Sequence, residues 1–252
     1  MEAEQYQVMF RREDEHWWYS GMRRVALAVL QQAVNGASNL TILDAGCGTG
    51  GTTARLGQFG TVYGVDLAWE ALIPASSRGL SGRLARASVE RLPFRDEVFD
   101  LVTSFEVLYH AGVPREMQAL AEFRRVLRPD GLLLLRLPAH DWLRGQHDRL
   151  VHTRHRYSRR EVGQKLARAG FSVQQLSWAN CSLFPPAAAK RLLEGLAQRQ
   201  DGSPSAAEPD LWQPPALVNR LLEQCLAVEA GALRRGVGLP FGLSVMALAR
   251  RT

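Results

Sequence analysis

The segment Ile42-Leu-Asp-Ala-Gly46-Cys-Gly48-Thr-Gly50-Gly51 joins a short apolar run to a helical pattern through a glycine-rich loop. Glycine has no Cβ, so such a loop can turn tightly and let a ligand approach the main chain. Asp66 lies 20 residues after Gly46, at the end of the next apolar run. An acid at this spacing indicates a nucleoside-containing cofactor. Because Gly46-x-Gly48-x-x-Gly51 also fits a dinucleotide site, these residues alone leave the cofactor open.

Around this segment, short apolar runs alternate with amphipathic stretches, which predicts an α/β, doubly wound, parallel sheet. A helical pattern before residue 40 precedes the alternation. The expected strands are residues 41–44, 61–66, 83–87, 99–104, 131–138, 171–178 and 242–249. The expected helices between them are residues 52–59, 69–78, 114–127 and 158–169, and the sixty or so residues before the last strand are mostly helical and punctuated by proline.

The composition is that of an ordinary globular protein, with 252 residues of which 46% are hydrophobic and 22% charged. No apolar run is long enough for a membrane helix, and the acidic start lacks the features of a secretory signal. Three widely spaced cysteines suggest neither a disulfide framework nor a metal site. We therefore expect a cytoplasmic protein that holds no metal. The net charge of +6 comes from arginines spread along the chain, which disfavours a nucleic-acid partner.

Further along the chain, several segments narrow the choice of protein family that the glycine loop leaves open. Asp44-Ala-Gly-Cys-Gly-Thr-Gly50 resembles the first motif of class I S-adenosylmethionine-dependent methyltransferases, and the chain resembles their small-molecule, type 11-like branch. The later motifs follow in that family's order, over about residues 40–180. They are Val62–Leu67, Ala87–Phe94, Val98–His110 and Glu122–Leu135.

The resemblance implies a cofactor, S-adenosyl-L-methionine, with S-adenosylhomocysteine as product. Asp66 would accept both ribose hydroxyls, because a carboxylate offers two acceptor oxygens. The glycine loop would pass under the methionine part, with Asp44 near its ammonium group, and Ser88 and Val89 would contact adenine. The full expected cofactor set is Asp44, Gly46, Cys47, Gly48, Gly50, Asp66, Leu67, Ser88, Val89, Ser104, Phe105 and Trp18.

Methyl transfer to a hydroxyl needs alignment and a base, whereas an amine needs only to be neutral. His110 follows the fourth strand at the edge where doubly wound folds place their active sites, so it is the first candidate base. The aromatic run His16-Trp-Trp-Tyr19 could fold over the cofactor, with His16 or Tyr19 facing the acceptor. The alternative interpretations are a capping or supporting histidine at 110 and tryptophans that only pack the first helix.

A basic cluster, residues 144–160, follows the fifth strand, where this fold commonly carries a substrate loop. It holds six arginines and three histidines, among them Arg149 and His147, against the single acid Asp148. Guanidinium groups suit carboxylate or phosphate, so one interpretation is an anionic or carrier-bound acceptor, and the other is a solvated basic loop with Tyr157 packed inward. The expected substrate contacts are Tyr109, Arg154, His155 and Tyr157.

We expect one methyltransferase domain over residues 1–252, with a Rossmann-like, seven-stranded, mostly parallel sheet whose last strand is antiparallel. Its parts would be an N-terminal helical lid (1–38), a cofactor-binding core (39–178), an inserted helical cap (179–239) and the last strand (240–252).

The expected reaction is O-methylation of a hydroxyl or carboxyl group of a small molecule in bacterial secondary metabolism, by a monomer or homodimer. The alternatives are N-methylation of a small molecule, an RNA or protein methyltransferase, a dinucleotide oxidoreductase, and a catalytically silent cofactor-binding protein.

Overall fold

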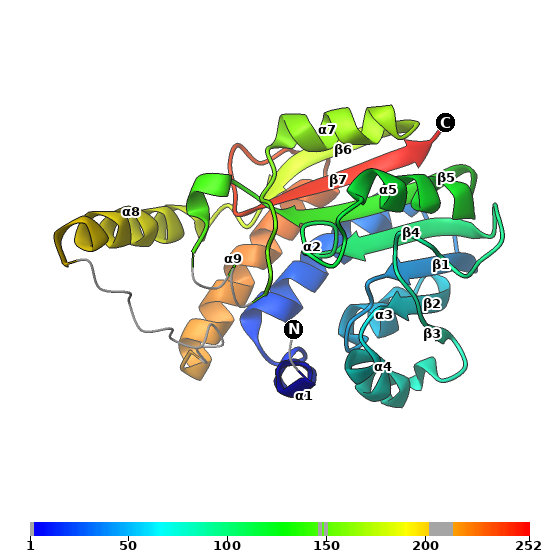
Figure 1. Cartoon of the computed structure of the whole chain (residues 1–252), viewed down its shortest axis with the longest axis horizontal. Helices are drawn as coiled ribbons and strands as arrows, with labels where there is room; N and C mark the ends of the chain where they lie inside the picture. The colour runs from blue at the N-terminus through cyan, green and yellow to red at the C-terminus, as the bar shows by residue number, and fades with distance from the viewer. Residues whose placement is uncertain (1–2, 146–147, 149–150, 202–213) are drawn as a thin grey trace.

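The computed structural model describes residues 3–145, 148, 151–201 and 214–252, and it contains a seven-stranded sheet between two layers of helices (Figure 1). The strand order is β3-β2-β1-β4-β5-β7-β6. The strands are β1 (Leu40–Ala45), β2 (Gly60–Asp66), β3 (Leu84–Arg86), β4 (Phe99–Phe105), β5 (Leu127–Pro138), β6 (Phe171–Ala179) and β7 (Ser244–Arg251).

The helices between residues 51 and 168 begin and end close to the expected positions. The described α-helices are α1 (Ala3–Arg12), α2 (Trp17–Val34), α3 (Gly51–Leu56), α4 (Trp69–Ala75), α5 (Glu116–Val126), α7 (Arg159–Arg168), α8 (Phe184–Asp201) and α9 (Ala216–Arg234). A short π-helical turn, η1 (Ser76–Leu80), extends α4, and a 3-10 turn, η2 (Asp141–Leu143), follows β5.

The strand directions match the expected fold class. β1 pairs in parallel with β2 and β4, and β4 pairs in parallel with β5. β7 lies between β5 and β6 and runs antiparallel to both. The predicted doubly wound sheet with an antiparallel last strand is therefore confirmed, and the carboxyl ends of the parallel strands share one edge.

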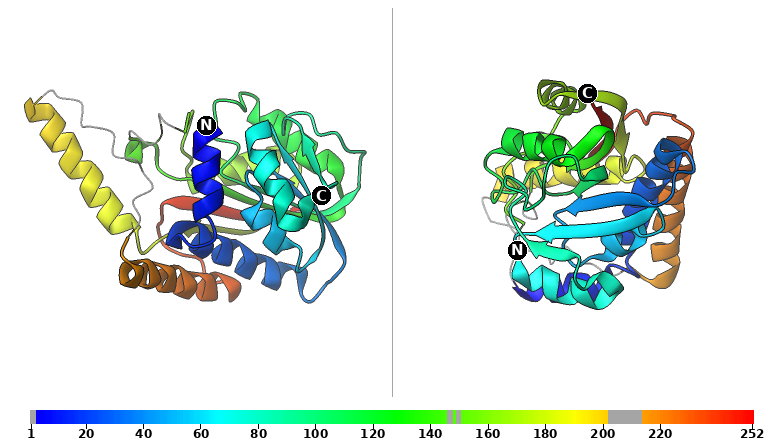
Figure 2. Two further views of the ribbon diagram at one scale, coloured as in Figure 1. Left: turned by 90° about the horizontal axis from the view of Figure 1, so that it is seen from below. Right: turned by 90° about the vertical axis from the view of Figure 1, so that its right-hand side faces the viewer.

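Alternation along the strands assigns each face of the sheet to a layer of helices. In β5, Leu133, Leu135 and Leu137 belong to the core under α5 and α7, whereas Leu132 and Leu134 belong to the core under α2 and α9. The right-hand view of Figure 2 shows these two layers on opposite sides of the sheet. Because both faces are covered, the strands are nearly continuous apolar runs.

The described residues between 179 and 239, where an inserted cap was expected, include two helices with different surroundings. α9 packs against α2 and buries Leu226, Ala230 and Leu233 in the core, so it is part of a layer on the sheet. α8 instead projects from the body of the protein (Figures 1 and 2). Among the described helices, none is long and apolar enough to cross a membrane.

The contact between α2 and α9 gives a direct test of the packing. A Cβ at Gly21 would lie 2.3 Å from Cδ1 of Leu226, which is fully buried and cannot move away. Gly21→Ala should therefore lower the free energy of unfolding by about 1–3 kcal/mol, through overpacking. The measurement is urea unfolding followed by circular dichroism.

Gly231→Ala is the matched control, because its new Cβ would meet only the end of Arg235, at 3.4 Å. Alanine is the better helix former, so this variant should gain up to about 1 kcal/mol. Equal effects of the two substitutions would contradict the close approach of α2 to α9 at Gly21.

Candidate functional site

The glycine loop lies at the carboxyl edge of the sheet, between β1 and α3. The backbone N–H groups of Gly46 and Cys47 donate to the carbonyl of Val65, at 2.8 and 2.9 Å, so the loop folds back over the end of β2. Gly46, Gly48 and Gly50 all have positive φ, between 53° and 88°. A Cβ at Gly46 would lie 2.1 Å from Cγ2 of Val107, so only glycine fits there.

Asp66 ends β2 beside this loop and holds it with its side chain. Oδ2 accepts from the N–H of Gly48 and Oδ1 from the N–H of Ala68, both at 2.9 Å. Burial raises the pKa of Asp66, and these backbone donors oppose that rise. A carboxylate has about four acceptor positions, so two backbone bonds leave room for two further donors.

Asp44, at the end of β1, lies beneath the loop. It is 2% exposed, and its oxygens accept from Thr53 Oγ1 at 2.6 Å and Thr103 Oγ1 at 2.8 Å. Burial raises its pKa to about 6 despite these bonds. The carboxylate thus joins β1 to α3 and β4, and it supports the loop from below.

The other expected cofactor residues lie at the same edge in different degrees of exposure. Ser104 is buried and its hydroxyl donates to the carbonyl of Ala45, while Phe105 lies under the guanidinium of Arg136. Ser88 Oγ accepts from the N–H of Glu90. Cys47 and Val89 are buried, and Leu67 is 54% exposed. The structure therefore places buried side chains beneath the edge and leaves Leu67 on its surface.

Helix α1 lies across the glycine loop, and its particular contacts there were not predicted from the sequence. A Cβ at Gly48 would lie 3.1 Å from Cε of Met9, and Glu13 accepts from Thr49 Oγ1 at 2.7 Å. Arg78 binds Glu13 at 2.9 Å and donates to the carbonyl of Thr49 at 3.1 Å. These contacts join α1, the loop and η1. They come from residues far apart in the chain with no characteristic spacing.

The aromatic run opens α2. His16 is the N-cap residue, and its Nδ1 accepts from the N–H of Trp18 at 3.3 Å. Trp17 and Trp18 pack against the core shared with α9, and the backbone N–H of Trp17 donates to Oδ1 of Asn219. Burial raises the pKa of Tyr19 to about 12, so its hydroxyl stays protonated at neutral pH. The run therefore anchors α2 to α9, and the expected contacts of His16, Trp18 and Tyr19 with ligands remain predictions.

His110 lies in the loop after β4, and its expected role as a base remains a prediction. Its Nδ1 accepts from the N–H of Gly112 at 2.9 Å, so in this arrangement the neutral ring carries its proton on Nε2. Burial lowers the pKa of His110, which keeps the ring neutral. The neighbouring Tyr109 is partly buried, and its carbonyl accepts from the N–H of Arg154 at 2.8 Å. The structure thus brings the loop after β4 beside the basic cluster.

In the basic cluster, four of the basic side chains have acidic partners. Arg154 lies 3.4 Å from Glu116, Arg156 binds Asp148 at 2.8 Å, and His155 binds Glu161 at 2.9 Å. Arg144 lies 3.5 Å from Asp141. Counting acids along the segment found only Asp148, because Glu116, Asp141 and Glu161 lie outside residues 144–160. Arg149 and His147 lie outside the described residues.

Tyr157 is the clearest correction among the expected substrate contacts. It is fully buried, and its hydroxyl donates to Glu116 at 2.6 Å and to the carbonyl of Leu108 at 3.2 Å. It therefore has no surface to offer to an acceptor. The alternative interpretation, with Tyr157 packed inward, is the one that the structure shows.

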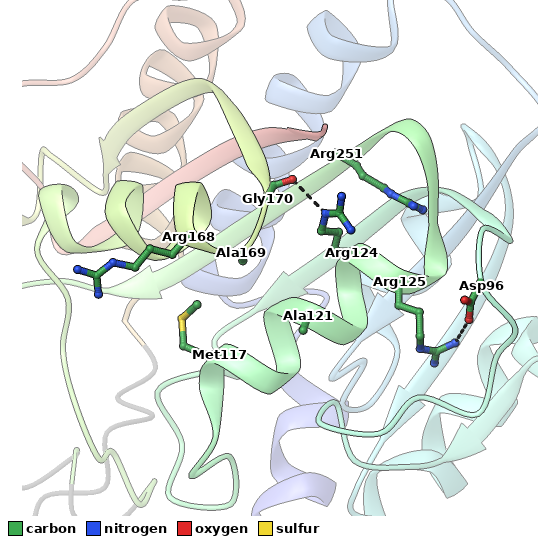
Figure 3. A pocket seen from close by; sticks show the side chains of 9 residues that line it. All are labelled: Asp96, Met117, Ala121, Arg124, Arg125, Arg168, Ala169, Gly170 and Arg251. Carbon is green, nitrogen blue, oxygen red and sulfur yellow. Dashed lines mark hydrogen bonds and ion pairs between the residues drawn. The ribbon is translucent and has the colours of Figure 1, made fainter.

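An open pocket lies at the opposite edge of the sheet, where α5 and α7 end (Figure 3). Arg124 donates to the carbonyl of Gly170, and Arg125 pairs with Asp96 at 2.7 Å. This pocket is separate from the glycine loop. In the part of the chain that the structure describes, no three His, Cys, Asp or Glu residues are grouped to hold a metal ion.

Comparison with known families shows what this part of the chain is similar to. Residues 43–135, from the end of β1 through most of β5, match the family described as a methyltransferase domain. This part of the chain is similar to methyltransferase domains. The matched segment includes the glycine loop, Asp66 and the loop after β4, which are the parts gathered at the carboxyl edge.

The similarity between this chain and individual relatives covers only part of each protein. A malonyl-[acyl-carrier protein] O-methyltransferase of Geobacter sulfurreducens is 34% identical over 171 residues, covering 60% of this chain and 61% of that protein. The protein of the same name from Buchnera aphidicola is 32% identical over 123 residues, covering 48% and 49%. The chain spans about half the length of the curated relatives it matches.

Solved structures extend the likeness of fold beyond the methyltransferase domain. An S-adenosylmethionine-dependent methyltransferase from Thermotoga maritima has a TM-score of 0.58 at 17% identity, covering 99% of this chain and 96% of that one. The [4+2]-cyclase SpnF has a TM-score of 0.57 at 20% identity, covering 91% and 80%. At such identities the likeness shows the fold alone, and a cyclase on the same fold shows that fold does not fix the reaction.

The contacts of Glu116 predict a pH-dependent contribution to stability. Although burial alone would raise its pKa, Lys165, Tyr157 and Arg154 hold the pKa of Glu116 below its usual value. A lowered carboxyl pKa stabilises the folded state above the pKa of the unfolded state, and this stabilisation is lost as pH falls through the folded-state value. Glu116→Gln should therefore cost about 1–3 kcal/mol at pH 7 and less near pH 4.

The measurement is urea unfolding of both proteins at pH 7 and pH 4. Asp96→Asn is the control, because Asp96 is 72% exposed and pairs with Arg125 on the surface. A difference between wild type and Glu116→Gln that does not shrink at pH 4 would contradict the lowered pKa.

Proposed function

We propose that the protein transfers a methyl group from S-adenosylmethionine to a small-molecule acceptor. The observation that carries this proposal is the Asp66 carboxylate, which ends β2, binds the N–H of Gly48 and lies within a segment matched as a methyltransferase domain. A nucleotide-type cofactor site at the carboxyl ends of β1 and β2 is what a doubly wound sheet provides.

The residues at this edge fit such a cofactor. Asp66 keeps acceptor positions for the two ribose hydroxyls after its backbone bonds are made. Gly46 and Gly48 present a loop without side chains to the methionine part, and Leu67 offers an exposed apolar surface beside the base. The cofactor supplies a methyl group on a positively charged sulfur. The chain's own residues bind and orient it, and they exclude water.

We further propose oxygen as the methylated atom. The support is that two relatives above 30% identity are named malonyl-[acyl-carrier protein] O-methyltransferases, which places a carboxyl oxygen among the acceptors of similar domains. A hydroxyl or carboxyl acceptor of bacterial secondary metabolism, handled in the cytoplasm, is consistent with that chemistry. The pairing of Arg154, His155 and Arg156 with acids gives an anionic acceptor less support than their charge alone suggested.

Cofactor binding is tested by calorimetric titration of S-adenosylhomocysteine into wild type and Asp66→Ala. Loss of two charge-assisted hydrogen bonds to the ribose, together with the loosened glycine loop, should weaken binding at least about 100-fold. Asp96→Ala, far from this edge, should bind like wild type. NADH is titrated in parallel and should not bind.

Saturable binding of NADH without binding of S-adenosylhomocysteine would overturn the proposal. In that case Gly46-x-Gly48-x-x-Gly51 would be a dinucleotide loop. Equal affinity of wild type and Asp66→Ala for S-adenosylhomocysteine would remove the role given to Asp66.

A further inference from the structure

Five rings gather at the carboxyl edge, beyond β5, and we call them the aromatic cluster. His140 stacks on Trp178 with ring centroids 4.6 Å apart, and Phe184 lies 5.2 Å from His140. The set comprises His140, Trp142, Trp178, Phe184 and Phe241. These rings come from the ends of β5 and β6, from η2, from the start of α8 and from the segment before β7. They therefore lie on the same edge as the glycine loop.

His140 has an unsatisfied ring nitrogen within this cluster. Its Nε2 is buried without a hydrogen-bond partner. Burial lowers the pKa of His140, and the backbone of Gly242 opposes that fall. A neutral imidazole protonated on Nδ1 has a lone pair on Nε2, so this nitrogen can accept a proton.

Asn180 gives a second, independent observation at the same place. It is 0% exposed, and neither its Oδ1 nor its Nδ2 has a hydrogen-bond partner. The N–H of Leu243 donates to the carbonyl of Asn180, and the N–H of Ala139 donates to the carbonyl of Leu243. Asn180 and His140 are thus held next to one another in the fold, through the segment that precedes β7.

The backbone at both positions is also unusual. His140 has a φ of 61° and Asn180 a φ of 62°, in the left-handed region that side chains other than asparagine seldom adopt. Buried polar atoms without partners and strained backbone both cost stability, and they are concentrated at binding sites. Packing alone accounts for neither of these features.

We propose that the aromatic cluster binds a planar aromatic acceptor that carries a hydroxyl group, and that Nε2 of His140 accepts its proton. The rings provide stacking surfaces for a flat apolar body, with Trp142 51% and Phe241 39% exposed. Nε2 provides the acceptor for a hydroxyl donor, and Asn180 provides further polar atoms. This proposal rests on the proposed function and names its substrate class.

The acceptor enters among the rings, because Nε2 is covered in the present arrangement. Trp142 belongs to the single turn η2, and Phe184 opens α8, the helix that projects from the body (Figure 2). Both rings therefore belong to elements outside the sheet.

The proposed step balances in charge and in bonds. The acceptor O–H bond breaks and its proton passes to Nε2, while the oxygen forms a bond to the methyl carbon. The carbon–sulfur bond breaks and sulfur keeps its electron pair as a neutral thioether, so the positive charge ends on the imidazolium of His140.

The test compares two probes of nearly the same shape, 2-naphthol and 2-methoxynaphthalene. Their binding to the full chain is measured by tryptophan fluorescence in the presence of S-adenosylhomocysteine. Only 2-naphthol can donate to Nε2, so wild type should bind it about tenfold more tightly, as expected for one hydrogen bond in a buried site. His140→Phe keeps a ring but removes Nε2, and it should bind the two probes equally.

Two further variants control for damage to the fold. His152→Phe changes another histidine of positive φ, 53°, which lies beside His110, and it should keep the tenfold preference. His140→Asn suits the left-handed backbone and removes the imidazole, so it should lose the preference even if His140→Phe does not fold.

Equal binding of the two probes by wild type, or a preference that survives in both His140 variants, would overturn the proposal. Failure of the proposed function is distinguishable from this. If wild type prefers 2-naphthol without S-adenosylhomocysteine present, and calorimetry shows that it does not bind that molecule, the cofactor assignment fails while the aromatic site stands.

Discussion

The hydrogen bond from the N–H of Gly48 to the carboxylate of Asp66 joins the two halves of the candidate site. One partner belongs to the loop after β1 and the other ends β2, so the bond fixes the loop relative to the sheet. It depends on a backbone that only glycine adopts easily, since Gly46, Gly48 and Gly50 all have positive φ. Asp44 supports the same loop from below, through Thr53 and Thr103. The carboxyl edge is therefore preorganised by two acids with different roles, the buried Asp44 and the partly buried Asp66.

Periodicity predicted the sheet well, because the pattern of apolar residues reports directly which side of a strand is covered. In β5, the alternation of Leu132 and Leu134 with Leu133 and Leu135 assigns the two faces to different helices. The same kind of pattern could not tell where α9 goes. Its leucines fit a cap or a layer on the sheet equally well, and only the close approach of Gly21 to Leu226 decides between them.

The side chains at the site were harder to predict, because chemistry there depends on partners that are distant in the chain. Arg154 and Tyr157 looked available in a segment with a single acid, yet both bind Glu116 from α5. His110 was expected to act as a base, and the structure adds that its Nδ1 accepts from a neighbouring backbone N–H. His140 was not singled out in the sequence, because a sequence does not show that Nε2 is buried without a hydrogen-bond partner. Charge and residue type can be read from a sequence, but the hydrogen-bond partners of a side chain cannot.

The contacts of α1 have a kinetic consequence. Met9 lies against Gly48, and the ion pair between Glu13 and Arg78 holds the end of the helix to the glycine loop. A molecule that leaves the loop on this side must first separate α1 from it, which is a local unfolding event with its own free energy. If the proposed cofactor product binds on this side of the loop, opening of a short N-terminal helix precedes its release, and residues that never touch the product would then affect turnover.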